Sequence, residues 1–392
     1  MESIRDKTAI VGIGVHDFSK DAKLTRWDMM CRSVRAALDD AGLTPEDIDG
    51  IVQYKYEEAG TDEQSIARAM GMGNLTFWGD CPWGSGASCS LVLRAAMAVA
   101  AGVANNVVVV RARTDSSAPP PPEWYGGGRE VPSGTATNQD FYNPFGLLSN
   151  TGRIAMIIRR YMHEYSINSD QFGWITTVCR EHGAQNPNSI FYNEPITIKD
   201  YQGSKMVVEP LRSLDCYIEV DGAVALIVTT AERARRLKQL PVYIMAGAQS
   251  MADGATMMTS YYRPVISALP EIGNVGKKLF EMAGITQKDI DLVQLDDSYA
   301  PLVSIQLEEL GFCGRGEGMA FCEGGNRIRV GAELPLNTSG GSLGEGHLYG
   351  MNHIAEGVRQ IRSTSTAQVK NAKLALVITG AGGPASGLIL RR

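Results

Sequence analysis

A short segment occurs twice in this chain, and the repeat constrains the fold more strongly than any other feature. The first copy, "AGLTPEDIDGIVQ", spans residues 41–53, and the second, "AGITQKDIDLVQ", spans residues 283–294. Both follow the pattern Ala-Gly-[Leu/Ile]-Thr-x-x-Asp-Ile-Asp and then Val-Gln, which is too long to be a recurrent turn alone. Each copy predicts a helix end, a capped turn, a short helical turn and a strand that enters the core. The repeat therefore predicts two related halves.

Each copy of the repeat is preceded by a predicted helix with one apolar face, and a strand is predicted before the first of these helices. Residues 8–15 predict a buried strand, and the helix that follows has Thr25 as its N-cap and ends at Gly42. Its apolar positions recur with the helical period: Trp27, Met30, Cys31, Val34, Leu38 and Ala41. A helix before the second copy likewise has one apolar face, made of Ile272, Val275, Leu279 and Met282.

Two glycine-rich turns extend the parallel between the halves. The turn that opens residues 84–102 leads through a helix to a strand at 107–110, and the turn that opens residues 344–363 leads in the same way to a strand at 374–379. Alternating strands and helices predict an α/β protein whose sheets are mostly parallel and covered on both faces.

The two halves differ in length, and an insertion explains the difference. We expect an N-terminal half at 1–240 and a C-terminal half at 241–392, with an inserted loop domain at about 114–215. The insertion starts with the extended, turn-rich stretch "SSAPPPPEWYGGG" and includes a helix near residues 151–164.

Composition excludes several classes of protein. The 392 residues are 44% hydrophobic, which suffices for a large core, and the net charge is −6 without a cluster of lysines or arginines. We therefore expect neither a nucleic-acid partner nor an anionic membrane partner. The N-terminus lacks the pattern of a signal peptide, and no apolar run is long enough to span a membrane. Seven cysteines without a C-x-x-C pair predict neither structural zinc nor a disulfide framework, and a reducing cytoplasm fits best.

Four further segments, in the right order, resemble the sterol-carrier-protein branch of the thiolase superfamily. They are "RRYMHEYSINSDQFGWITTVCREHGAQNPNSIFYNEPITIKDY", "PLRSLDCYIEVDGAVALIV", "ELGFCGRGEGMAF" and "NTSGGSLGEGHLYG". The resemblance implies the thiolase fold, in which two βαβαβαββ halves form five αβαβα layers around a central pair of helices. It also implies acyl-CoA substrates and a homodimer.

The nucleophilic cysteine of a thiolase has no clear counterpart here. Counting back from the end of the first core helix places that nucleophile at Ser85 or Gly86. Cys81 lies about one helical turn too early and is followed by Pro82, whereas Cys89 lies inside the helix. We expect both cysteines to be buried packing residues, with a nucleophilic role for either as the alternative.

Other departures from the thiolase pattern replace catalytic residues with tyrosines. The family's His-Asp-Cys-Phe segment aligns with Asp296-Asp297-Ser298-Tyr299, and its Gly-His-Pro turn aligns with residues 346–349, "GHLY". The C-terminal segment "ITGAGGPASG" carries no cysteine. This pattern resembles the thiolase-like aldolases, which cleave the side chain of steroid CoA thioesters in bacterial sterol catabolism.

The chemistry of such an aldolase requires an enolate to be stabilised and two protons to be moved. We expect the glycine-rich turns to offer N–H groups to the thioester oxygen, with Ser85, Gly86 and Gly346 in contact with the substrate. The resemblance implies proton transfer by Tyr299 and Tyr349, and leaves open which of them is the base. A phenol has a pKa of about 10, so the base needs a neighbouring donor or cation.

Two further residues complete the expected site. His347 occupies the family's histidine position and can donate to the enolate oxygen or assist a tyrosine, and Asp296 can orient the other groups. Asp297 is a weaker candidate of the same kind, and we expect His353, inside the helix, to be structural.

The expected reaction is the retro-aldol cleavage of a β-hydroxyacyl-CoA. The resemblance implies a 17-hydroxy steroid CoA ester as substrate, with a 17-keto steroid and propionyl-CoA as products. It also implies a small zinc-ribbon/OB-fold partner protein, while no cofactor and no metal are needed by this chain. One alternative is a cysteine-dependent thiolase, which would form an acyl-enzyme. The other is a non-catalytic thiolase-like subunit that binds lipid thioesters.

Overall fold

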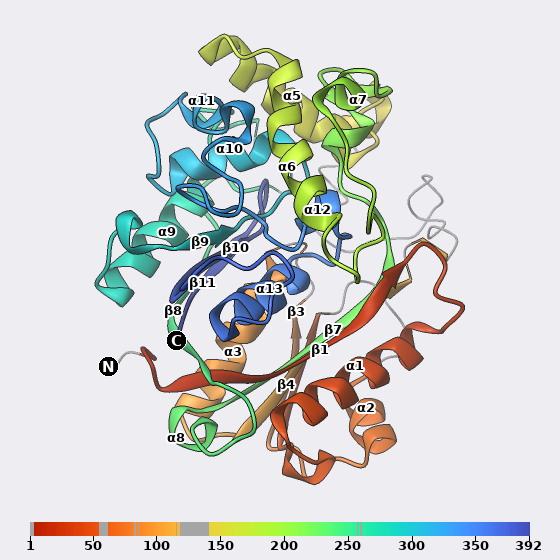
Figure 1. Cartoon of the computed structure of the whole chain (residues 1–392), viewed down its shortest axis with the longest axis vertical. Helices are drawn as coiled ribbons and strands as arrows, with labels where there is room; N and C mark the ends of the chain where they lie inside the picture. The colour runs from red at the N-terminus through yellow and green to blue at the C-terminus, as the bar shows by residue number, and fades with distance from the viewer. Residues whose placement is uncertain are drawn as a thin grey trace.

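Nine strands form one continuous sheet in the part of the chain that the structure describes (Figure 1). The structure is a computed structural model, and it describes residues 4–54, 62–81, 84, 86–114, 116–117, 141–256, 258 and 261–392. The strand order is β3-β2-β4-β7-β1-β8-β11-β10-β9. The strands are β1 (Thr8–Ser19), β2 (Gly50–Tyr54), β3 (Phe77–Cys81), β4 (Asn106–Thr114), β7 (Asp221–Thr230), β8 (Val242–Ser250), β9 (Leu292–Gln294), β10 (Leu374–Thr379) and β11 (Ala385–Arg391).

The helices in the described part of the chain are α1 (Arg26–Ala41), α2 (Glu63–Met70), α3 (Ala87–Ala100), α5 (Asn150–Tyr165), α6 (Gly173–Gly183), α7 (Ile198–Gln202), α8 (Ala231–Ala234), α9 (Pro270–Ala283), α10 (Ala300–Glu309), α11 (Gly318–Phe321), α12 (Gly341–Gly344) and α13 (Met351–Arg362). Among these helices, α1, α3, α9 and α13 pack against the sheet, and others, such as α5 and α7, lie away from it (Figure 1). A separate hairpin of β5 (Met206–Val208) and β6 (Leu211–Arg212) lies near α5. Among the described residues, no helix is both long and apolar enough to cross a membrane.

The sequence repeat forms the same pattern of hydrogen bonds in both halves. In the first copy, the Asp47 carboxylate accepts the backbone N–H of Thr44 at 2.9 Å, and Asp49 accepts the N–H of Asn106 at 2.8 Å, where β4 starts. In the second copy, Asp289 accepts the N–H of Thr286 at 2.8 Å, and Asp291 accepts the N–H of Leu374 at 2.9 Å, where β10 starts. The shared spacing thus caps a turn and fixes the start of a neighbouring strand.

Strand order relates the two halves in space. The order is β3-β2-β4-β7-β1 on one side and β8-β11-β10-β9 on the other, so each half places its last strand beside its first. Leu336 forms a parallel bridge with Val293 of β9, at the position that β3 occupies next to β2. The boundary near residue 240 and the limits of the inserted loop domain stay predictions.

The expectation of mostly parallel sheets is wrong. Only the pairs β2–β3, β2–β4 and β9–β10 are parallel among the described strands, and every other pair is antiparallel. The reason lies in the connections: β11 follows β10 through a short turn instead of a helix, and a strand joined in this way must run antiparallel.

Side-chain alternation along the strands separates the core into layers. In β4, Val108 and Val110 pack with α1, whereas Val107 and Val109 face α3 and α13. The other half of the sheet is enclosed between α3 and α13 on one face and α9 and α10 on the other. Figure 1 shows the two central helices between these outer layers. This arrangement confirms the predicted five-layer thiolase fold.

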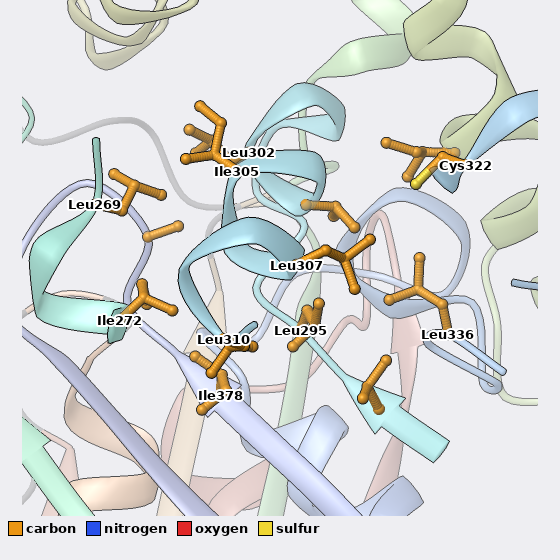
Figure 2. Packing of buried hydrophobic residues seen from close by; sticks show 14 of the residues in the cluster. Leu269, Ile272, Leu295, Leu302, Ile305, Leu307, Leu310, Cys322, Leu336 and Ile378 are labelled. Atoms are coloured by element: carbon orange, nitrogen blue, oxygen red, sulfur yellow. The ribbon is translucent and has the colours of Figure 1, made fainter. Parts of the chain in front are cut away.

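The outer layer of the second half has a dense apolar core. Figure 2 shows its side chains packed between α9, α10 and the neighbouring strands: Leu269, Ile272, Leu295, Leu302, Ile305, Leu307, Leu310, Leu336 and Ile378. All of these side chains are buried. The predicted helix near 151–164 is confirmed as α5, and the predicted caps Thr25 and Gly42 bound α1.

The aspartate that starts β10 gives a test of the repeat. Asp291→Ala removes a charged acceptor from the N–H groups of Lys373 and Leu374, so we expect it to lower the free energy of unfolding by about 2 kcal/mol. Urea denaturation measures this change. Asp39→Ala, which alters an exposed carboxylate on α1, is the control and should shift the free energy by less than about 0.5 kcal/mol. Equal stability of the two variants would contradict the assigned role.

Candidate active site

Three segments from distant parts of the sequence meet at the proposed site. The loop Asp296–Tyr299 follows β9, and the loop Gly346–Gly350 joins α12 to α13. Between them lies the segment Cys216–Glu219, which we call the strap. Its backbone forms isolated bridges that pair Cys216 with Tyr299 and Glu219 with His347. The strap therefore fixes the position of one loop relative to the other.

Four aromatic rings form a continuous row across these segments. The ring centroids of Tyr299 and Tyr217 are 5.8 Å apart, those of Tyr217 and His347 are 4.4 Å apart, and those of His347 and Tyr349 are 4.4 Å apart. The structure thus brings the expected residues Tyr299, His347 and Tyr349 together. Their roles in catalysis stay predictions.

Tyr217 is the member of the row that the sequence did not reveal. It belongs to the strap, and its backbone N–H donates to the carbonyl of Ser298 at 2.8 Å. Burial raises the pKa of Tyr217 well above its ordinary value, so its hydroxyl is neutral and able to donate. The only sequence signal was its place directly after Cys216 in a segment that resembles the family.

His347 is held as a neutral ring. Its Nδ1 lies 3.1 Å from Oγ of Ser342, and the residue is only 3% exposed. Burial lowers the pKa of His347 to about 3, and the guanidinium group of Arg113 acts in the same direction against the opposing charge of Asp296. A neutral imidazole in this place can donate a hydrogen bond without carrying a charge.

Two buried arginines of β4 lie against the other end of the row. The guanidinium carbon of Arg113 is 4.3 Å from the centre of the Tyr349 ring, and that of Arg111 is 4.1 Å from the centre of the Tyr54 ring. Arg111 also donates to the carbonyl of Tyr54 at 2.7 Å. Cations stacked on aromatic faces stabilise the rings and place positive charge beside Tyr349.

The carboxylate of Asp296 accepts hydrogen bonds mainly from backbone N–H groups. Its Oδ1 accepts from the N–H and hydroxyl of Ser298, and its Oδ2 accepts from the N–H groups of Gly380 at 2.9 Å and Ala381 at 3.1 Å. The carboxylate therefore ties the loop after β9 to the turn between β10 and β11. The carboxylate is surrounded by donors, and its expected orienting function stays a prediction.

Asp297 and His353 form a buried pair beneath the site. Asp297 Oδ1 is 3.0 Å from Nε2 of His353 and accepts the N–H of Ser342 at 2.8 Å, so it caps α12. Burial alone would raise the pKa of Asp297, but the hydrogen bond and the charge of His353 outweigh burial and lower that pKa. The pKa of His353 is raised by Asp297 despite burial. The contacts of the His353 ring are with Asp297 and Asn352, and its structural role stays a prediction.

The structure does not leave all of the expected backbone N–H donors available to a substrate. Ser85 lies outside the described residues. Gly86 is the N-cap of α3, and a Cβ there would lie 1.9 Å from the carbonyl oxygen of Pro384, so only glycine fits. The N–H of Gly346 donates to the carbonyl of Gly341 at 3.1 Å, and that of His347 donates to Ile218 at 3.0 Å. These two N–H groups are therefore engaged by backbone, not free for a thioester oxygen.

The glycine-rich turn of the second half is not directly a helix N-terminus. A single short turn, α12, comes first, and α13 begins only at Met351 after Gly350 in the left-handed region. His347 consequently lies in the connection between two helices. The expectation that the glycine-rich turn near residues 344–347 leads straight into the following helix is corrected accordingly.

Both candidate cysteines are buried, and Cys89 lacks the properties of an activated nucleophile. Cys89 is fully buried inside α3, and burial raises the pKa of its thiol to about 12. Cys81 is the last residue of β3 and is 4% exposed. A reactive thiolate requires a lowered pKa and access, which Cys89 does not have. Among the described residues, no group of His, Cys, Asp or Glu side chains is placed to hold a metal ion.

Comparisons with known proteins agree with this fold. The family model described as "Thiolase C-terminal domain-like" matches residues 255–390. The 17-hydroxy-3-oxo-4-pregnene-20-carboxyl-CoA lyase of Mycobacterium tuberculosis is 46% identical over 98% of this chain and 99% of its own length. The steroid side-chain-cleaving aldolase of Thermomonospora curvata is 44% identical over 100% of this chain and 99% of its own.

A solved structure also matches the whole chain, at an identity close to those of the two relatives above. The structure described as the Ltp2-ChsH2(DUF35) aldolase superposes with a TM-score of 0.93 at 43% identity, and the match covers 100% of this chain and 99% of that chain. The five-layer fold and the family model together define a protein of the thiolase superfamily. Within it, the chain belongs to the family of the steroid side-chain-cleaving aldolases.

The buried pair beneath the site gives a stability test. Asp297→Asn leaves His353 without its charged partner and weakens the cap of α12, so we expect the free energy of unfolding to fall by about 3 kcal/mol. Urea denaturation at neutral pH measures this loss. Glu281→Gln, an exposed carboxylate on α9, is the control.

The pH dependence follows from the two pKa directions. The lowered pKa of Asp297 gives stability that is present above about pH 4 and lost as pH falls through the folded-state value. The raised pKa of His353 gives stability that is present below about pH 6.5 and lost as pH rises through the folded-state value. Asp297→Asn should flatten both limbs, and an unchanged profile would contradict the pairing.

Proposed function

We propose that this chain is a carbon–carbon lyase that cleaves a 17-hydroxy steroid side-chain CoA ester by a retro-aldol reaction. The products are a 17-keto steroid and propionyl-CoA, and the setting is bacterial steroid catabolism. The single observation that carries the proposal is the row Tyr299, Tyr217, His347 and Tyr349 on a thiolase fold. Identity of 46% to a 17-hydroxy-3-oxo-4-pregnene-20-carboxyl-CoA lyase supports the choice of substrate.

The proposed reaction requires two proton transfers and one bond cleavage. A base removes the proton of the β-hydroxyl group, and its oxygen becomes the carbonyl of the leaving ketone as the Cα–Cβ bond breaks. The electron pair of that bond becomes the enolate of the thioester, which an acid then protonates at Cα. His347, as a neutral donor, stabilises the enolate oxygen, and Tyr299 and Tyr349 move the two protons.

The surroundings of the two tyrosines differ. Burial raises the pKa of Tyr299 above its ordinary value, and its hydroxyl contacts Thr151. Tyr349 instead lies against the guanidinium groups of Arg113 and Arg111. A comparison of pH profiles between the two phenylalanine variants will identify which tyrosine is the base, because each profile loses the limb of the group removed.

No cofactor enters the proposed reaction. Retro-aldol cleavage moves protons and one electron pair within the substrate, so the net reaction needs no oxidant or reductant, and CoA is part of the substrate. We also propose that the reaction takes place in a reducing cytoplasm, which the seven free cysteines support.

We further propose that the chain acts as a homodimer in complex with a small zinc-ribbon/OB-fold protein. The solved structure that is 43% identical is described as an Ltp2-ChsH2(DUF35) aldolase, and this second component, ChsH2(DUF35), supports a partner of this kind. Size-exclusion chromatography with light scattering of the chain, alone and mixed with its DUF35 partner, measures the composition of the complex.

The experiment that tests the function is direct. The purified chain, with and without its DUF35 partner, is incubated with the 17-hydroxy steroid CoA ester, and the release of ketone and propionyl-CoA is followed by mass spectrometry. Tyr299→Phe and Tyr349→Phe should each lower kcat/KM by about 100-fold or more, because each removes a proton-transfer group. Tyr262→Phe, whose side chain is 84% exposed, should leave kcat/KM unchanged.

Two outcomes would favour the alternatives. A covalent acyl group on Cys81 or Cys89 would indicate a cysteine-dependent thiolase, and full activity of both phenylalanine variants would indicate a non-catalytic subunit. Inactivation by thiol alkylation is not diagnostic by itself. Cys216 is paired with Tyr299 through the strap, so a bulky group on its sulfur would obstruct the site without any acyl-enzyme.

The neutral state of His347 gives a further prediction. Because its pKa is lowered to about 3, the ring stays uncharged from about pH 4 upwards and contributes no limb to the activity profile near neutrality. His347→Gln, which keeps a neutral donor, should lower kcat by about 10-fold while the apparent pKa values of kcat/KM stay constant. If the fall of kcat/KM at acidic pH disappeared in this variant, His347 would be shown to titrate in the working pH range.

A further inference from the structure

The hydroxyl group of Tyr299 has a side-chain partner from the inserted segment. Its oxygen lies 3.2 Å from Oγ1 of Thr151, which is close enough for a hydrogen bond in which either group donates. Tyr299 is 1% exposed, so bulk water does not take the place of this partner. The contact spans 148 residues of sequence and joins α5 to the loop after β9.

Thr151 is placed by the way α5 begins. Ser149 is the N-cap of the helix, and its side chain accepts the N–H of Gly152 at 3.1 Å. Thr151 is therefore in the first turn of a 16-residue helix, where the peptide dipoles present positive charge. The Tyr299 hydroxyl thus meets both a hydroxyl donor and the positive end of a helix, and both favour negative charge on the phenol oxygen.

Several neighbouring groups raise the pKa of Tyr299, and Thr151 acts in the opposite direction. Burial raises the pKa of Tyr299, and Cys216, Asp296 and Tyr349 act in the same direction. The hydrogen bond from Thr151 is the contribution that lowers this pKa. Thr151 also lowers the pKa of the Cys216 thiol, although burial dominates and raises that pKa to about 12. One hydroxyl therefore interacts with both the phenol and the thiol.

We propose that Thr151 is a positioning residue for Tyr299, whose hydrogen bond holds the phenol oxygen in the geometry for proton transfer. The inference rests on the proposed function, in which Tyr299 moves a proton of the steroid thioester. The hydroxyl of Thr151 accepts from the neutral phenol and donates to the phenolate by rotating about its Cβ–Oγ1 bond. It therefore stays bonded to Tyr299 in both protonation states.

A purely structural role for Thr151 leads to different expectations. A polar residue in the first turn of a helix often serves the helix alone, and its replacement then affects stability and not the chemical step. A positioning role affects kcat and the titration of Tyr299 while the KM for the substrate is retained. The two roles are separated by variants that remove or keep the hydroxyl at constant shape.

The test compares Thr151→Val with Thr151→Ser in the complete enzyme with its DUF35 partner. Valine keeps the volume but loses the hydroxyl, and we expect kcat to fall by about 10- to 100-fold with KM within about twofold of the wild type. Serine keeps the hydroxyl, and kcat should stay within about threefold of the wild type. The limb of the pH profile that disappears in Tyr299→Phe should move to higher pH in Thr151→Val.

Thr176→Val is the matched control. Thr176 is buried in α6, and its Oγ1 has no hydrogen-bond partner in the described part of the chain, so the same substitution there should leave kcat and the pH profile unchanged. Thermal unfolding of all three variants, monitored by circular dichroism, establishes that each is folded.

A second readout does not depend on activity. Spectrophotometric titration of the phenolate, with Tyr299→Phe used to assign the signal, measures the pKa of Tyr299 in the wild type and in Thr151→Val. A higher pKa in the valine variant supports the inference. A wild-type kcat with an unmoved titration in Thr151→Val overturns it, as does equal impairment of the valine and serine variants. Absence of ketone release by the wild type would instead refute the proposed function, while the titration would still decide on the contact.

Discussion

The buried carboxylate of Asp297 joins the elements on which the site depends. It accepts the N–H of Ser342 and so caps α12, and it pairs with His353 of the central helix α13. A Cβ on Gly341 would lie 2.3 Å from this carboxylate, so the cap requires glycine there. Ser342 in turn holds the ring of His347. A single buried charge thus fixes the loop after β9, the turn of α12 and the aromatic row relative to one another.

The fold could be predicted from the sequence because its main signal is local. The repeated Thr-x-x-Asp caps a turn within four residues, and the second aspartate, Asp49 or Asp291, fixes the start of the next strand in each half. Such short-range devices leave a pattern that can be read directly. Strand direction leaves none: whether β11 returns parallel or antiparallel depends on the length of one connection, and the alternation of strands and helices led to the wrong expectation.

The candidate site was predictable only where it resembles the family's motifs. Tyr299, His347 and Tyr349 stand at positions where the family's catalytic motifs align, whereas Tyr217 lies in a matching segment that assigns it no role, and Thr151 lies at the start of a predicted helix without any mark of function. The backbone donors were harder still. Glycine-rich sequences suggest free N–H groups, but tertiary contacts decide which of them are already bonded, as they are at Gly346 and His347. Hydrogen-bond availability is a property of the assembled structure.

The strap has a consequence for how such proteins diverge. Its four residues enter the site at the end of the inserted segment, yet they supply the backbone that aligns two loops of the C-terminal half. An exchange of the inserted segment together with the strap would therefore also replace the backbone that aligns these two loops. Substitutions in the strap and in the two loops that it contacts are therefore expected to depend on one another, despite their separation along the chain.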